Sequence, residues 1–171
     1  MLDQDKMNCM TLIAGKNASA TGRVLVAHNE DDGGFVVVRH GWVPPQDWAA
    51  GSVMPAEEGC AEIPQVSHTL GYYWTEYRKD TCGLTTADGF VNERGVVIVS
   101  NSMGTSRESM ENADCVKDGG IGYNLRRALA ERAGSAREGA RILMELIDEW
   151  GYAPSGRAYT IADKDEAFMF Q

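Results

Sequence analysis

The residues best suited to covalent chemistry gather near the N-terminus. Cys9 precedes one apolar run, and the polar tetrad His28–Asp31 follows a second one. A Gly-, Asn- and Ser-rich segment, residues 15–22, lies between the two runs, and this pattern predicts a β-hairpin. In a hairpin of this length Cys9 meets the tetrad, and a cysteine beside polar groups can form a thiolate nucleophile. A buried structural cysteine beside a solvated acidic turn is the alternative interpretation.

The elements that must position this hairpin follow from apolar runs along the chain. The expected strands are residues 10–14, 24–27, 35–38, 68–77, 84–91, 96–100, 157–162 and 166–170. We expect 35–38 to pair with 24–27, and 84–91 to form a hairpin with 96–100. Residues 41–64 hold four prolines and are expected to be an irregular loop. Trp42 and Trp48 would anchor that loop, with pocket lining as the less favoured alternative.

Two helices are expected between the strands. The first opens at Gly119-Gly120 and has an apolar stripe that includes Leu125 and Leu129. Three basic residues would lie on its solvated face: Arg126, Arg127 and Arg132.

The second helix carries the clearest local signals. Ser135 and Glu138 form an S-x-x-E capping box at its start, and Gly151 ends it. Strands, then two helices, then strands predict an α+β fold rather than alternating βαβ units.

Composition limits the classes of partner. The 171 residues suit one domain, and a net charge of −9 argues against nucleic acid or an anionic membrane surface. The sequence shows no apolar run of about 18 residues and no secretory signal. The four cysteines include no C-x-x-C pair, so we expect free thiols, no metal or cofactor, and a cytoplasmic location.

Four stretches resemble peptidase family C69, the dipeptidase A and secernin group of N-terminal-nucleophile hydrolases. They are CMTLIAGKNASATGRVLVAHNEDD, GFVNERGVVIVSNSMGTSRE, GGIGYNLRRALAERAGSAREGARILMELI and WGYAPSGRAYTIADKDEAFMF. The resemblance implies an αββα sandwich, with residues 1–8 as a leader and residues 9–171 as the N-terminal part of the domain. The remaining portion of the fold would be a further segment of the same protein, and the last strand would otherwise need covering or favour self-association.

The resemblance also implies roles for individual residues. Removal of the leader would make Cys9 the first residue, with its α-amine as base and its thiol as nucleophile. Asp31 matches the aspartate that holds the amine and thiol in related amidases such as penicillin V acylase and bile salt hydrolase. Asn101 would donate to the oxyanion, with Ser102 as its competitor.

Two further residues of the tetrad would bind or orient the substrate. Asn29 would fix the turn. His28 falls where the related amidases carry an arginine, and its role stays open because histidine is shorter and mostly neutral at pH 7.

The function that the resemblance implies is cysteine-dependent hydrolysis of dipeptides. One alternative is an acylase of the same superfamily that cleaves a non-peptide amide. The other is a non-catalytic, secernin-like protein in which Cys9 and Asp31 are remnants. The first two readings imply a small peptide or amide as substrate.

Overall fold

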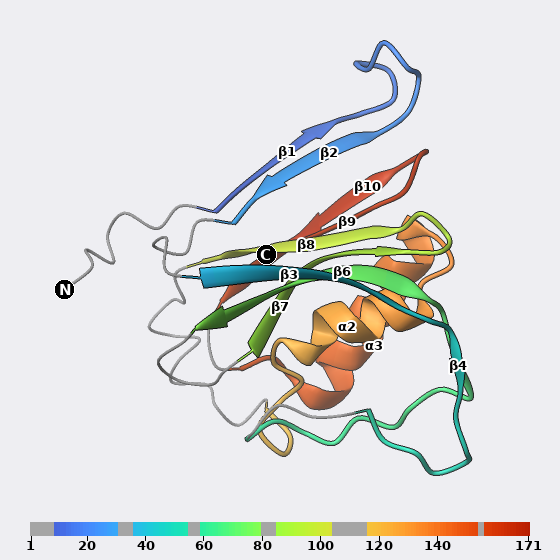
Figure 1. Cartoon of the computed structure of the whole chain (residues 1–171), viewed down its shortest axis with the longest axis vertical. Helices are drawn as coiled ribbons and strands as arrows, with labels where there is room; N and C mark the ends of the chain where they lie inside the picture. Colours follow the sequence, from blue (N-terminus) through green and yellow to red (C-terminus); the bar gives the residue numbers. More distant parts are fainter. Residues whose placement is uncertain (1–8, 31–35, 55–58, 80–84, 104–115, 154–155) are drawn as a thin grey trace, which may run out of the picture.

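The computed structural model describes residues 9–30, 36–54, 59–79, 85–103, 116–153 and 156–171, and these form an α+β fold with antiparallel sheets and two helices (Figure 1). A six-stranded sheet has the strand order β10-β9-β8-β7-β6-β3. Its strands are β3 (Val36–Val43), β6 (Tyr72–Lys79), β7 (Thr85–Asn92), β8 (Val97–Ser102), β9 (Arg157–Ala162) and β10 (Ala167–Phe170). Two smaller sheets pair β1 (Met10–Ala14) with β2 (Leu25–Asn29) and β4 (Gln46–Asp47) with β5 (His68–Thr69).

Both helices cover one face of the large sheet. Helix α2 (Asn124–Arg132) packs on β7 and β8, and α3 (Ala136–Trp150) packs on β9 and β10 (Figure 1). Because strand side chains alternate, every second residue of β8 and β9 points toward the helices. Ile98 and Ile161 are fully buried in this layer with Leu125 and Leu129 of α2. The hydrophobic core therefore lies between the sheet and the helix pair.

The hairpin β1–β2 lies on the other face of the sheet (Figure 1). Asn101 is three residues after Ile98 on β8, so it points away from the helices, and it contacts Thr11 of β1. The base of β2 is attached as well, since the Val24 amide donates to the Lys164 carbonyl oxygen at 3.0 Å, in the turn between β9 and β10. The described segments thus stack in three layers: hairpin, sheet and helices.

Local signals predicted several elements correctly. Strands β7 and β8 pair in antiparallel fashion around the turn, as expected. The Ser135 hydroxyl accepts a hydrogen bond from the Glu138 amide at 3.2 Å, which confirms the N-terminal cap of α3. The Glu138 carboxylate reaches back to the Gly134 amide at 2.9 Å, and Gly151 ends the helix at a φ of 70°.

The pairing predicted for residues 35–38 is wrong. Strand β3 runs from Val36 to Val43 and pairs along its whole length with β6, not with the hairpin. The eight paired positions on β6 offer more backbone hydrogen bonds than the short β2 could, and β2 is already joined to β1. Trp42 consequently lies in a strand, with 53% of its surface exposed. Trp48 does anchor the following segment, because its indole N–H donates to the Thr69 hydroxyl at 3.1 Å.

The solvated face predicted for the first helix is also wrong. Arg126 is 1% exposed, and its guanidinium lies 5.1 Å from the centre of the Tyr123 ring. The segment 59–71 covers α2 on the side away from the sheet, where Arg132 donates to the Pro64 carbonyl oxygen at 2.9 Å. The helix begins at Asn124, after the positive φ angles of the glycines that precede it.

Candidate active site

The hairpin positions its polar residues by simple strand alternation. Thr11 and His28 are directly opposite each other in the β1–β2 register. Cys9 comes just before β1 and Glu30 just after β2, two residues from Thr11 and His28 respectively. Side chains two residues apart share a face of a strand. All four are half-buried, while the residues between them are exposed.

These side chains form a continuous series of hydrogen bonds. The Cys9 thiol donates to Oε1 of Glu30 at 3.3 Å, and Oε2 of Glu30 lies 3.2 Å from Nε2 of His28. Nδ1 of His28 lies 2.8 Å from the Thr11 hydroxyl, which in turn donates to Oδ1 of Asn101 at 2.6 Å. The series begins at the Cys9 sulfur and ends at a side-chain amide on β8, so it joins the hairpin to the sheet.

The structure brings together three of the residues singled out from the sequence. Cys9, His28 and Asn101 all belong to this series of hydrogen bonds. Asn29 is exposed on the opposite face of β2 and takes no part in it. Ser102 is exposed at the end of β8, and strand alternation directs it away from Asn101. Asp31 lies outside the described residues.

Two members of the series, Thr11 and Glu30, were not assigned a role from the sequence. Glu30 belongs to the polar tetrad, but the family resemblance assigns the catalytic carboxylate to Asp31. The signal that identifies both residues is the period of two. Thr11 follows Cys9 by two positions and Glu30 follows His28 by two, so a correct hairpin register places all four on one face.

The ionisable side chains of the site are a glutamate, a histidine and a cysteine thiol. The Glu30 and His28 side chains are 24% and 11% exposed, so water only partly screens their interaction. A carboxylate beside a thiol opposes loss of the thiol proton, whereas a cation beside that carboxylate offsets the effect. The state of His28 therefore decides how readily a negative charge can form on Cys9.

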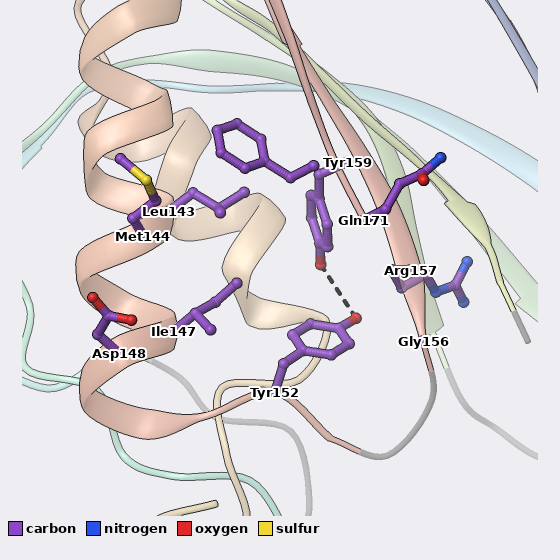
Figure 2. Close-up of a pocket in the computed structure, with 10 residues that line it drawn as sticks. Leu143, Met144, Ile147, Asp148, Tyr152, Gly156, Arg157, Tyr159 and Gln171 are labelled. Atoms are coloured by element: carbon purple, nitrogen blue, oxygen red, sulfur yellow. Dashed lines mark hydrogen bonds between the residues drawn. The ribbon is translucent and has the colours of Figure 1, made fainter. Parts of the chain in front are cut away.

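The structure also describes a cavity of about 430 Å³ on the helix side of the sheet, between α3 and the strands β9 and β10 (Figure 2). Leu143, Ile147 and Phe170 make much of its lining apolar. The Tyr159 hydroxyl donates to the Tyr152 hydroxyl at 3.2 Å, and burial raises the pKa of both phenols. The described residues that line this cavity include neither cysteine nor histidine.

Within the described segments, there is no group of three or more His, Cys, Asp or Glu side chains placed to hold a metal ion. No helix in that part of the chain is long and apolar enough to cross a membrane. Cys9 and Cys60 are thiols, and Cys82 and Cys115 fall outside the described residues.

Fold and site together define an α+β protein that presents a half-buried thiol within a network of acid, histidine, hydroxyl and amide groups. The sequence matches the model of Peptidase family C69 over residues 8–171, and the chain belongs to this family. A protein of Latilactobacillus sakei named "Probable dipeptidase" is 22% identical to it over 161 residues, which cover 94% of this chain. The chain spans 34% of that relative's length.

Proposed function

We propose that the chain is the N-terminal part of a dipeptidase that uses Cys9 as its nucleophile. The observation that carries this proposal is the Cys9 thiol held by Glu30 in a network that extends to an amide on the neighbouring sheet. Membership of family C69 and the likeness to a protein named as a dipeptidase support the same reaction. The hairpin, sheet and helices would form three layers of an αββα sandwich, with residues 9–171 as its N-terminal portion.

The proposed reaction begins with removal of residues 1–8. Before cleavage the nitrogen of Cys9 is an amide and cannot accept a proton. Afterwards it is an α-amine with an ordinary pKa of about 7.7–8.0, able to take the thiol proton near neutrality. Asp31 is assigned to hold this amine and thiol, by analogy with the related amidases.

The chemistry then follows nucleophilic acyl transfer. The thiolate attacks the carbonyl carbon of the peptide bond, and Asn101 donates a hydrogen bond to the oxyanion that forms. The α-ammonium group returns its proton to the leaving amine as the C–N bond breaks. Water then hydrolyses the thioester, which regenerates the thiol and releases the second product.

Mass spectrometry and a single substitution test this proposal. The intact mass and N-terminal sequence of the wild-type protein should show a chain that starts at Cys9. Cys9→Ala should keep residues 1–8 and lose dipeptide hydrolysis altogether, because both steps need the thiol. Dipeptide turnover by Cys9→Ala would refute the proposed mechanism.

A substrate panel then distinguishes the alternatives. Dipeptides should be hydrolysed, and acyl amides such as penicillin V or conjugated bile salts should not. Preference for the acyl amides would make the protein an acylase. A processed or unprocessed chain that turns over neither class, even when extended to the length of its relatives, would identify a non-catalytic member of the family.

A further inference from the structure

The positions of protons in the Cys9 network follow from its hydrogen-bond geometry. A threonine hydroxyl has one hydrogen to donate. Thr11 donates it to Oδ1 of Asn101 at 2.6 Å, so at its 2.8 Å contact with His28 it must be the acceptor. Nδ1 of His28 therefore carries a hydrogen.

The other ring nitrogen faces a carboxyl group. Nε2 of His28 lies 3.2 Å from Oε2 of Glu30, and two lone pairs at this distance would repel each other. One proton must therefore lie between the two groups. An imidazolium donates from both ring nitrogens and a carboxylate only accepts, so a proton on Nε2 of His28 satisfies both contacts of the ring. His28 is then an imidazolium, paired with the Glu30 carboxylate that accepts from the Cys9 thiol.

The hydrogen bond from Thr11 also fixes the orientation of the Asn101 side-chain amide. An amide side chain has an acceptor oxygen and a donor NH₂ group, and a bond to one fixes the orientation of the other. With its Oδ1 accepting from Thr11, the Asn101 side chain directs its Nδ2 group away from Thr11. That is the orientation an oxyanion donor requires.

We propose that Thr11 is a positioning residue that couples a His28–Glu30 ion pair to Asn101 and holds the amide with its Nδ2 group directed to the oxyanion. Thr11 does not touch the substrate in this scheme. It accepts a hydrogen bond from the charged ring and passes its own hydrogen to the amide oxygen. Within this pair the imidazolium offsets the negative charge of the Glu30 carboxylate, which accepts from the Cys9 thiol. This inference rests on the proposed function for its kinetic consequences, but not for the network itself.

The kinetic test compares two substitutions at one position. Thr11→Val keeps the shape of the side chain and removes the hydroxyl, whereas Thr11→Ser keeps the hydroxyl. Thr11→Val should lower kcat for a dipeptide about tenfold to a hundredfold with KM changed less than about threefold, because only the transition state needs the oriented amide. Thr11→Ser should retain at least about a third of the wild-type kcat. Thr21→Val, in the exposed turn of the same hairpin, is the matched control and should leave kcat unchanged.

A double-mutant cycle tests whether Thr11 acts through Asn101. If it does, Thr11→Val in an Asn101→Ala background should cost almost nothing further, because the group that Thr11 orients is gone. Multiplicative losses in the double variant, or a Thr11→Ser variant as slow as Thr11→Val, would overturn the proposal. Circular dichroism and thermal unfolding of each variant establish that the fold is intact.

A spectroscopic measurement tests the network without turnover. A ¹⁵N–¹H correlation spectrum of the imidazole groups at pH 7 should show His28 with hydrogens on both ring nitrogens, assigned by comparison with His28→Gln. A neutral His28 whose Nδ1 lacks a hydrogen would overturn the proposal, since Thr11 would then donate to the ring. If Cys9 proves catalytically silent, the proposed function fails while this measurement still decides the state of the network.

Discussion

Two polar networks in this molecule are built around a glutamate, and they differ in burial and in what they contact. Glu131 on α2 is 2% exposed and accepts from Arg127 and from Gln65, both at 2.7 Å. Tyr72 of β6 donates to the same carboxylate at 3.5 Å. Glu30 is 24% exposed and contacts a histidine and a thiol.

The difference leads us to expect a structural role for the Glu131 network and a chemical role for the Glu30 network. A carboxylate taken out of water must be paired, so the Glu131 network fixes α2 against β6 and the segment 59–71. Its partners are an arginine, an amide and a phenol, and none of these described partners is a thiol. The Glu30 side chain is more exposed, and its network ends at the Cys9 sulfur. We expect changes at Glu131 to affect folding, and changes at Glu30 to affect chemistry.

The largest expected effect comes from breaking the buried network. Glu131→Gln preserves the size of the side chain but leaves the Arg127 guanidinium without its counter-charge, which should lower the free energy of unfolding by about 3–5 kcal/mol. Chemical denaturation measures this loss. Glu145→Gln is the matched control, since Glu145 also pairs with an arginine one helical turn away, but both side chains are more than half exposed. That variant should lose less than about 1 kcal/mol, and equal losses at both positions would contradict the comparison.

The fold could be predicted from the sequence wherever the signal was local. The capping box at Ser135 and the turn between β7 and β8 are set by residues within a few positions of each other. The partner of β3 could not be predicted in this way, because the paired residues of β6 lie 29 to 43 positions further on and the competing hairpin was nearer. The exposure predicted for Arg126 was wrong for a similar reason: its burial depends on packing around α2 that helical periodicity does not reveal.

The candidate site was predicted in part for the same physical reason. The hairpin explains why Cys9 and the residues after β2 come together, and this follows from local pattern alone. The contact between Thr11 and Asn101 spans 90 positions in the chain and depends on how the hairpin lies on the sheet. A short sequence pattern cannot give that placement, so only the structure reveals the contact of Thr11 with Asn101.

The second prediction concerns Glu30, where we expect a substitution to lower activity and to leave stability nearly unchanged. Glu30→Gln removes the negative charge that pairs with His28 and that accepts the hydrogen bond from the Cys9 thiol. We expect dipeptide kcat/KM to fall about tenfold to a hundredfold, while the free energy of unfolding changes by less than about 1 kcal/mol.

Parallel kinetics and denaturation measure both quantities for Glu30→Gln. Asp47→Asn offers a matched control, because Asp47 also contacts a histidine, His68, at 2.6 Å, but in an exposed pair on β4 and β5. That variant should change neither quantity. A Glu30→Gln protein that is destabilised as strongly as Glu131→Gln, with undiminished turnover once folded, would make both networks structural.

The smallest expected effect concerns the response of the buried network to alkaline pH. Burial raises the pKa of Tyr72 from 10.0 to about 12, so the folded state keeps the phenol proton in a range where the unfolded state releases it. By linkage, this residue's contribution to stability is complete below pH 10 and is lost as the pH rises from 10 to 12. The loss should be roughly 1–2 kcal/mol.

Tyr72→Phe should flatten this part of the stability curve, as measured by denaturation between pH 9 and 12. Tyr73→Phe, at an exposed neighbour on β6, should leave the wild-type slope in place. An unchanged slope in Tyr72→Phe would mean that the network around Glu131 opens to water well before the protein unfolds, which would remove the contrast in burial on which the comparison depends.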